Sequence, residues 1–275
     1  MTTKKWELGV IVTLDENVAA TLDRVRQMGL TTCQLCSWQP DILTERLAQQ
    51  VRSACEASGV RVSSYWAGHS GRTVWNFLEG PATIGLVPAP TRRQRLDELK
   101  KGSDFAAMIG VPSITTHVGF IPEDPNSADY VELIPVLREL AEHCRAAGQF
   151  FCFETGQETP VTLLRAIQDI GTDNLGINLD PANLILYGKA NPVDALDVFG
   201  RYVRGLHAKD GLYPTDGREL GKEVRLGDGK VDFKRLIAGL KSLGFQGPVT
   251  IEREITGDEQ TRDIRHAIAY LEPLL

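Results

Sequence analysis

Four residues that can bind a cation recur at regular intervals in the second half of the chain. Each stands at or next to the end of a short apolar run: Glu154, Asp180, His207 and Glu252. The spacings of 26, 27 and 45 residues fit two strand–loop–helix–loop units and a third unit lengthened by a glycine-rich loop. If the runs are neighbouring parallel strands of a barrel, the four side chains meet at one end of it. Three carboxylates and one imidazole would then be available to one divalent metal ion.

The apolar runs alternate with helix-like stretches along the chain, which is typical of a (β/α)8 barrel. We predict strands at residues 6–13, 32–38, 60–65, 113–117, 150–154, 175–180, 203–209 and 249–252. We predict helices at residues 18–28, 43–57, 92–109, 128–147, 162–169, 193–199, 233–243 and 261–270. The loop at residues 66–90 is too long to be a simple connector. The predicted fold class is α/β, a single (β/α)8 TIM barrel, with residues 1–275 forming one domain.

The residues that share a strand face with the candidate ligands support closure of this barrel. Side chains two positions apart in a strand lie on the same face. In three of the four strands the ligand face is mainly small or polar, as at Asn178, Gly205 and Thr250. Aliphatic residues such as Ile177 and Leu179 face the other way. A narrow barrel lumen with a polar end needs this arrangement.

A single carboxylate at a strand end is more often a helix cap or an ion-pair partner than a metal ligand. Four ionisable groups together would repel one another and lose solvation unless a cation compensated their charge, which favours a metal site. Three oxygen donors and one imidazole suit Mn²⁺, Mg²⁺ or Co²⁺, and they tolerate Zn²⁺. The tautomer of His207 must be fixed by an acceptor that no sequence motif identifies.

Other side chains near the same barrel end are candidates for substrate contacts. His117 follows the fourth strand and is expected to contact substrate or a ligand, with a core histidine as the alternative, whereas His69 is expected on the surface. Arg225 precedes Gly227 and could bind a phosphate or carboxylate group. Three tryptophans lie in the loops, where they could stack on sugar C–H surfaces or simply pack a lid: Trp38, Trp66 and Trp75.

Composition excludes several classes of partner. The net charge is −6, and the 30 basic residues are scattered, which disfavours nucleic acid. No apolar run approaches about 18 residues, so no membrane span is predicted. The five cysteines lie in ordinary packed segments, which favours reduced thiols and a cytoplasmic location.

Four segments resemble the signature segments of the sugar phosphate isomerase/epimerase family, the xylose isomerase-like barrels. They are Leu179–Asn183, His207–Asp210, Leu226–Phe233 and Gly247–Glu252. The resemblance implies the TIM barrel, the four-residue metal set, and an isomerase or epimerase of a sugar, keto-sugar or sugar phosphate that works through an enediolate. It also implies that Glu154 and Glu252 act both as ligands and as the acid/base pair, as in ketose 3-epimerases.

Two positions depart from the ketose 3-epimerase pattern. Asn183 stands where those enzymes often carry histidine; it can hydrogen-bond a hydroxyl but cannot shuttle a proton near pH 7. The segment at His207 is closer to the inosose dehydratase branch, in which loss of water follows the same enolisation. Lys209 could steady an enolate or a leaving oxygen, or it could form an ordinary ion pair with Asp210 or Glu254. A keto-sugar dehydratase or lyase is therefore the main alternative.

Two further functions remain open on this barrel. One is a nuclease resembling endonuclease IV, a family that uses three zinc ions and additional histidine ligands. The other is a barrel that binds a sugar without turning it over. The expected partner is a small-molecule sugar. A homo-oligomer is also compatible with the sequence, because the long loops of such barrels often pack against another subunit.

Overall fold

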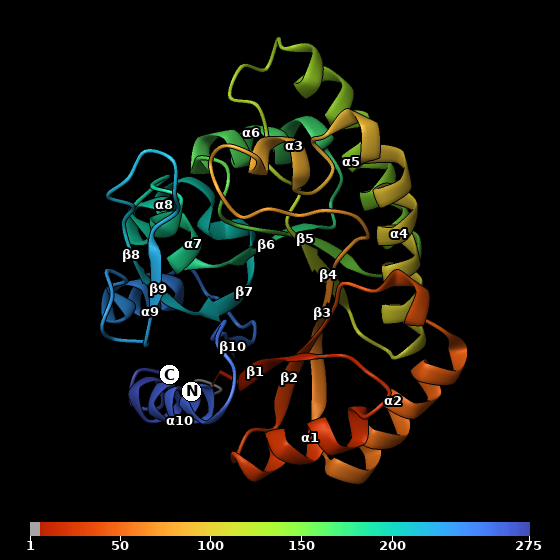
Figure 1. Cartoon of the computed structure of the whole chain (residues 1–275), viewed down its shortest axis with the longest axis vertical. Coiled ribbons are helices and arrows are strands. Elements are labelled where there is room, and N and C mark those ends of the chain that lie inside the picture. Colours follow the sequence, from red (N-terminus) through yellow and green to blue (C-terminus); the bar gives the residue numbers. More distant parts are fainter. Residues whose placement is uncertain (1–5) are drawn as a thin grey trace.

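Eight parallel strands close into a barrel in the computed structural model, which describes residues 6–275 (Figure 1). Around the barrel each strand pairs with the next in the order β1, β10, β7, β6, β5, β4, β3, β2. The strand bounds are β1 (Leu8–Thr13), β2 (Thr32–Ser37), β3 (Arg61–Ala67), β4 (Ser113–Thr116), β5 (Phe150–Glu154), β6 (Leu175–Leu179), β7 (Val203–Ala208) and β10 (Val249–Ile251). The predicted (β/α)8 barrel is confirmed.

The predicted helices surround these strands, within three residues of their expected bounds (Figure 1). Local signals explain their ends: Thr44 accepts the N–H of Leu47 at the start of α2, and Gly59, with φ 70°, ends it. No helix within residues 6–275 is both long and apolar enough to cross a membrane. The helices are α1 (Val18–Gln27), α2 (Glu45–Ser58), α4 (Ala89–Met108), α5 (Ala128–Ala146), α6 (Pro160–Ile170), α8 (Pro192–Phe199), α9 (Phe233–Ser242) and α10 (Asp258–Leu271).

Several short elements were not predicted. They are α3 (Gly80–Thr83), α7 (Pro181–Leu186), the 3-10 helices η1 (Pro40–Ile42) and η2 (Gly200–Tyr202), and an antiparallel hairpin of β8 (Asp210–Leu212) and β9 (Lys222–Val224). Each is too short to show a hydrophobic period. All except η2 follow the carboxyl end of a barrel strand, so they build the end of the barrel where active sites of this fold lie.

The barrel lumen contains the small and polar residues that strand periodicity assigned to it. A Cβ atom on Gly176 would lie 2.9 Å from Cys152 Sγ, and one on Gly205 would lie 2.5 Å from Asn178 Oδ1. These glycines therefore leave room for the facing side chains of neighbouring strands. Phe153 packs on Phe151, two residues away on the other face of β5, with ring centroids 4.8 Å apart.

Buried polar side chains hold the long loop at residues 66–90 against the barrel. Arg95 on α4 donates to the carbonyl of Gly85 at 2.8 Å, and His69 Nε2 accepts the N–H of Gly85 at 3.2 Å. The expectation of a surface His69 is wrong, because its side chain is buried beneath the loop. Burial lowers the pKa of His69 to about 4, which keeps the ring neutral and able to accept this hydrogen bond.

Candidate metal centre and active site

The four residues predicted to bind a metal converge at the carboxyl end of the barrel. One ligand atom from each lies within 4.8 Å of all the others. His207 Nδ1 is 2.8 Å from Glu252 Oε2, 3.3 Å from Glu154 Oε1 and 3.8 Å from Asp180 Oδ2. Adjacent strands therefore bring these four side chains together as the sequence spacing suggested, even though 98 residues separate the first from the last.

Secondary structure positions each carboxylate. Glu154 is the last residue of β5, and one of its oxygens accepts a hydrogen bond from Trp66 Nε1. Asp180 is the N-cap of α7: its Oδ1 accepts the N–H of Asn183 at 2.8 Å, which leaves Oδ2 for the cluster. Glu252 follows β10 directly, beside Ala208 of β7, whose carbonyl accepts its N–H at 3.2 Å. Each carboxylate is thus oriented by its own backbone position or by a neighbour.

Gln34 orients the imidazole of His207. Its Oε1 lies 2.7 Å from His207 Nε2, and because an amide oxygen can only accept, Nε2 carries the proton. The lone pair of Nδ1 then faces the three carboxylates. Gln34 is the acceptor that the sequence could not identify. Its position inside a predicted strand was the only indication, and the structure shows that its side chain is buried there.

The hydrogen-bond pattern fits a divalent cation. Within the described part of the chain, three buried ligand atoms have no hydrogen-bond partner: Asp180 Oδ2, His207 Nδ1 and Glu252 Oε2. The 2.8 Å approach of Nδ1 to Glu252 therefore lacks hydrogen-bond geometry. Buried polar atoms left unpaired in this way are costly unless they share a ligand. Three oxygens and one neutral imidazole nitrogen form a donor set suited to Mn²⁺, Mg²⁺ or Co²⁺.

The charges of the cluster also require compensation. Burial opposes protonation of His207, but the charges of Glu154 and Glu252 outweigh it and raise its pKa well above the usual value. Without a metal, a proton on the ring thus supplies part of the missing positive charge. Because a metal must displace that proton to bind Nδ1, cation and proton compete for the same position.

Lys209 is buried beside the cluster and makes ion pairs with its carboxylates. Its Nζ is 3.0 Å from Glu254, 3.5 Å from Glu252 and 3.6 Å from Asp180. Burial opposes its charge, but Glu252 and Glu254 outweigh that effect and raise its pKa, so the ammonium persists. Of the two ion pairs considered from the sequence, the one with Glu254 forms. Asp210 instead accepts the backbone N–H groups of residues 227, 229 and 231, each at 3.0 Å.

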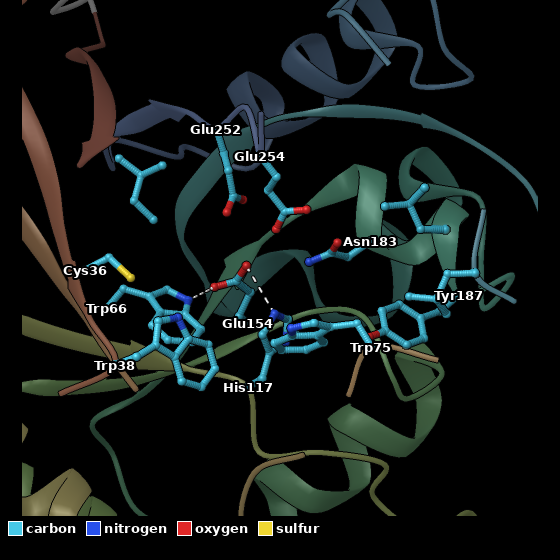
Figure 2. A pocket seen from close by; sticks show the side chains of 13 residues that line it. Cys36, Trp38, Trp66, Trp75, His117, Glu154, Asn183, Tyr187, Glu252 and Glu254 are labelled. Carbon is cyan, nitrogen blue, oxygen red and sulfur yellow. Dashed lines mark hydrogen bonds and ion pairs between the residues drawn. The ribbon is translucent and has the colours of Figure 1, made fainter. Parts of the chain in front are cut away.

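A cavity of about 220 Å³ opens above the cluster, and Figure 2 shows the side chains around it. Five of the six expected substrate contacts line it: Trp38, Trp66, Trp75, His117 and Asn183. His117 Nε2 lies 3.5 Å from Glu154 Oε1, so it stands next to the cluster rather than in the core. Of the four metal-site residues, Glu154 and Glu252 line the cavity, whereas Asp180 and His207 lie fully buried beneath it.

Arg225 is the expected substrate contact that the structure does not bring to the cavity. Its side chain is exposed on the surface and pairs with Asp228 three residues later, at 3.0 Å. The glycine-rich segment turns this side chain outward because Asp210 holds its backbone N–H groups inward. The structure therefore gives Arg225 no role in binding substrate at this site.

Sequence reasoning missed several residues that line the cavity. Tyr187 follows α7, Glu254 lies two residues after Glu252, and Cys36 is the penultimate residue of β2. Burial, followed by the charges of Glu252 and Glu154, raises the pKa of Cys36, which favours its thiol form. None of these positions belongs to a recognisable motif; the loops bring them to the cavity.

The metal residues and the aromatic residues come from different halves of the barrel. All four metal residues lie at or near the carboxyl ends of β5, β6, β7 and β10, in the second half of the chain. The aromatic wall comes from β3 and from the loops after β2, β3 and β4: Trp38, Trp66, Trp75 and His117. Figure 2 shows Glu252 on one side of the cavity and the four aromatic residues on the other, with the carboxylate of Glu154 between them.

Comparisons with known proteins agree with this geometry. The chain is 39% identical to a xylose isomerase domain protein from Planctomyces limnophilus, with a TM-score of 0.93 over 98% of both chains. It has the fold of D-psicose 3-epimerase from Clostridium cellulolyticum H10, at 14% identity, with a TM-score of 0.73 over 98% of this chain and 99% of that one.

Among curated proteins, an uncharacterized protein from Methanocaldococcus jannaschii is 30% identical over 154 residues, 51% of this chain. The match spans about half of that relative, 50% of its length. The model of the xylose isomerase-like TIM barrel family matches residues 22–274, nearly the whole chain. The resemblance found in the sequence is confirmed, and the chain belongs to the xylose isomerase-like TIM barrel family.

Proposed function

We propose that the protein is a divalent-metal-dependent isomerase or epimerase of a sugar, keto-sugar or sugar phosphate. One observation carries the proposal: of the four residues that converge on a common point, the two glutamates also line the cavity. Asp180 and His207 can hold a cation but cannot reach a substrate, whereas Glu154 and Glu252 can do both. The family and the epimerase among its structural neighbours support this class of reaction.

The chemistry requires two carboxylates that face one bound substrate. One glutamate removes a proton from a carbon next to a carbonyl, and the other returns a proton to the opposite face, which inverts the centre. A divalent cation held by Glu154, Asp180, His207 and Glu252 would stabilise the negative charge that develops on the substrate oxygens. Trp66 fixes one oxygen of Glu154, so the orientation of that carboxylate is set before substrate arrives.

A solvent-exchange experiment tests the proposal. With Mn²⁺ or Mg²⁺ present, a responsive ketose should exchange a hydrogen next to its carbonyl with deuterium from the solvent. Glu154→Gln and Glu252→Gln should each reduce this exchange by at least about 100-fold, because general acid–base catalysis contributes factors of that size. Glu139→Gln, on the surface of α5, is the control and should exchange at the wild-type rate.

Because both glutamates are also ligands, metal content must be measured in the same preparations. Loss of exchange in a variant that still holds stoichiometric metal identifies a role in proton transfer. Exchange at the wild-type rate in both variants would show that the acid/base assignment is wrong.

Dehydration of a keto-sugar on the same site is the second candidate. It is favoured by Asn183, which lines the cavity where ketose 3-epimerases often carry a histidine and which cannot transfer protons near pH 7. The buried ammonium of Lys209 donates to Asn183 Oδ1 at 3.4 Å and so holds the amide that lines the cavity. Product analysis separates the two reactions, since loss of water gives an unsaturated ketone that absorbs light whereas epimerisation conserves mass.

A further inference from the structure

We propose that the substrate is an uncharged sugar held in closed-ring form, a keto-glycoside, whose substituent extends from the metal centre along a strip of three indoles to the cavity mouth. The inference names the substrate class of the site and rests on the proposed function. Three features of the cavity carry it: its charge, the continuity of its aromatic wall and the contrast between its two sides.

The charges of the cavity disfavour phosphorylated and carboxylated sugars. Within residues 6–275, no lysine or arginine lines it, whereas three carboxylates do: Glu154, Glu252 and Glu254. The nearby ammonium of Lys209 is already paired with Glu254 at 3.0 Å. Even with a divalent cation bound, these carboxylates and Asp180 outnumber the positive charges. A phosphate would therefore meet repulsion and find no arginine fork or lysine to bind it.

Three indoles form a continuous strip from the metal centre to the surface. Trp66 is buried and hydrogen-bonded to Glu154. Its ring centroid is 4.7 Å from that of Trp38, which in turn lies 6.1 Å from that of Trp75. Trp38 and Trp75 are 38% and 41% exposed, so their outer faces are free at the mouth. Exposed indoles next to a deep polar site are a common feature of ligand-binding surfaces.

The two sides of the cavity differ in a way that fits a sugar ring. In Figure 2, Glu252, Glu254 and Asn183 lie on one side, and the indoles lie on the other. A closed ring has a hydroxyl-bearing edge for the polar side and a flat C–H face for an indole, whereas an open chain has no such face. A ring stays closed when its anomeric carbon carries a substituent, which makes the molecule a glycoside.

The length of the indole strip is the reason to expect a substituent on the sugar ring. Three indoles in a row offer more apolar surface than the face of one ring can cover, and Leu220 also lines the cavity. We therefore expect the ring to stack near Trp66 and the substituent to lie against Trp38 and Trp75. One proton leaves the carbon beside the ring ketone and another is delivered to the opposite face of that carbon, so the reaction needs no oxidant or second substrate.

Equilibrium binding tests the inference without turnover. Metal-loaded full-length protein is titrated with methyl glucoside, phenyl glucoside and glucose 6-phosphate by calorimetry, and the fluorescence of the indoles is followed. Phenyl glucoside should bind at least about tenfold more tightly than methyl glucoside, a difference of about 1.4 kcal/mol. Glucose 6-phosphate should bind more weakly than methyl glucoside. Tighter binding of the phosphate, or equal binding of the two glucosides, would overturn the proposal.

Variants show where the substituent lies. Trp75→Ala should weaken binding of phenyl glucoside at least about tenfold while leaving binding of methyl glucoside and Mn²⁺ within about twofold. Tyr213→Ala is the matched control, because Tyr213 is similarly exposed at 43% but does not line the cavity. Equal effects of both substitutions would contradict the indole strip. Trp75 is largely exposed, so its removal should not prevent folding, and circular dichroism checks this.

Solvent exchange distinguishes this inference from the proposed function. A ring-locked keto-glycoside and a ketose phosphate are compared as exchange substrates with wild-type protein and Glu154→Gln. Exchange that depends on Glu154 but occurs only with the phosphate would overturn the glycoside proposal and leave the isomerase proposal intact. Glucoside binding that depends on Trp75, without exchange on any substrate, would overturn the isomerase proposal and leave the binding site for the glycoside intact.

Discussion

At the scale of single residues, the metal site depends on groups that do not themselves bind the metal. His207 can offer Nδ1 because Gln34 Oε1 accepts the hydrogen bond from Nε2–H, and Asp180 can offer Oδ2 because its Oδ1 caps α7. Both arrangements fix a ligand atom before a cation arrives, which reduces the cost of organising the site.

Removal of the Gln34 acceptor should weaken metal binding. In Gln34→Leu the Nε2–H of His207 loses its partner, the ring can change tautomer, and the Kd for Mn²⁺ should rise by about 10- to 100-fold. Gln34→Glu keeps an acceptor at this position and should bind Mn²⁺ more tightly than the leucine variant. Calorimetric titration measures both. Wild-type affinity in Gln34→Leu would show that the contact has no part in orienting the ligand.

The sequence indicated which residues could bind a metal but not what orients them. Ligand types at strand ends are visible as local patterns, because strand periodicity determines which side chains share a face. Gln34 and His207 are 173 residues apart and meet across the closed barrel, so no local spacing relates them. Arg225 shows the opposite error: its local context suggested anion binding, but the backbone contacts of Asp210 turn it to the surface.

At the scale of elements, the long loop after β3 is held by buried polar contacts that depend on pH. His69 accepts the N–H of Gly85, and Arg95 donates to the carbonyl of the same residue. These contacts join the two ends of the Trp75 segment to each other and to α4, which limits how far that indole can move from the cavity.

Acidification should destabilise the protein through His69. Burial lowers the pKa of His69 to about 4, below its ordinary value near 6.5, so between these values the unfolded chain binds a proton that the folded chain excludes. The free energy of unfolding should thus fall as pH falls from about 6.5 to 4, by about 3 kcal/mol from this residue. His69→Gln keeps an acceptor but does not titrate, so urea unfolding of the two proteins should diverge across this range. Parallel pH profiles would contradict the assignment.

Long periodic elements were predictable and short ones were not. The helices α1, α2 and α5 show enough turns for their apolar faces and caps to be recognised. The hairpin of β8 and β9 and the six-residue α7 depend on contacts with the rest of the barrel end. They form because their backbone groups find partners there, as when Gly221 donates to the carbonyl of Leu186.

At the scale of the whole molecule, a bound cation should stabilise the fold. The cluster concentrates three negative charges, at the ends of three strands, beside one imidazole, so a cation that binds there favours the folded chain over the unfolded one. At a free Mn²⁺ concentration of about 100 times Kd, the free energy of unfolding should rise by about 2.7 kcal/mol. Chelation should reverse the effect.

Asp180→Asn isolates the contribution of the metal. Asparagine can still accept the N–H of Asn183 as an N-cap, so α7 should form, while one ligand charge is lost. Thermal unfolding with and without Mn²⁺ should therefore show a large shift for the wild type and a much smaller one for this variant. Equal shifts would place the stabilising ion elsewhere.

The alternation of strands and helices was sufficient to predict the barrel, because eight repeated units leave few other topologies. The shape of the cavity was not predictable in the same way, since it depends on where three tryptophans from separate segments meet.

The separation of metal residues and aromatic residues between the two halves of the barrel has a consequence for how such proteins diversify. Replacements in the loops that carry Trp38 and Trp75 can change which molecule is accepted while the ion and its two glutamates stay in place. Natural relatives and laboratory libraries can therefore acquire new selectivity through the loops that carry Trp38 and Trp75, while Gln34, Trp66 and the four metal residues keep the reactive centre unchanged.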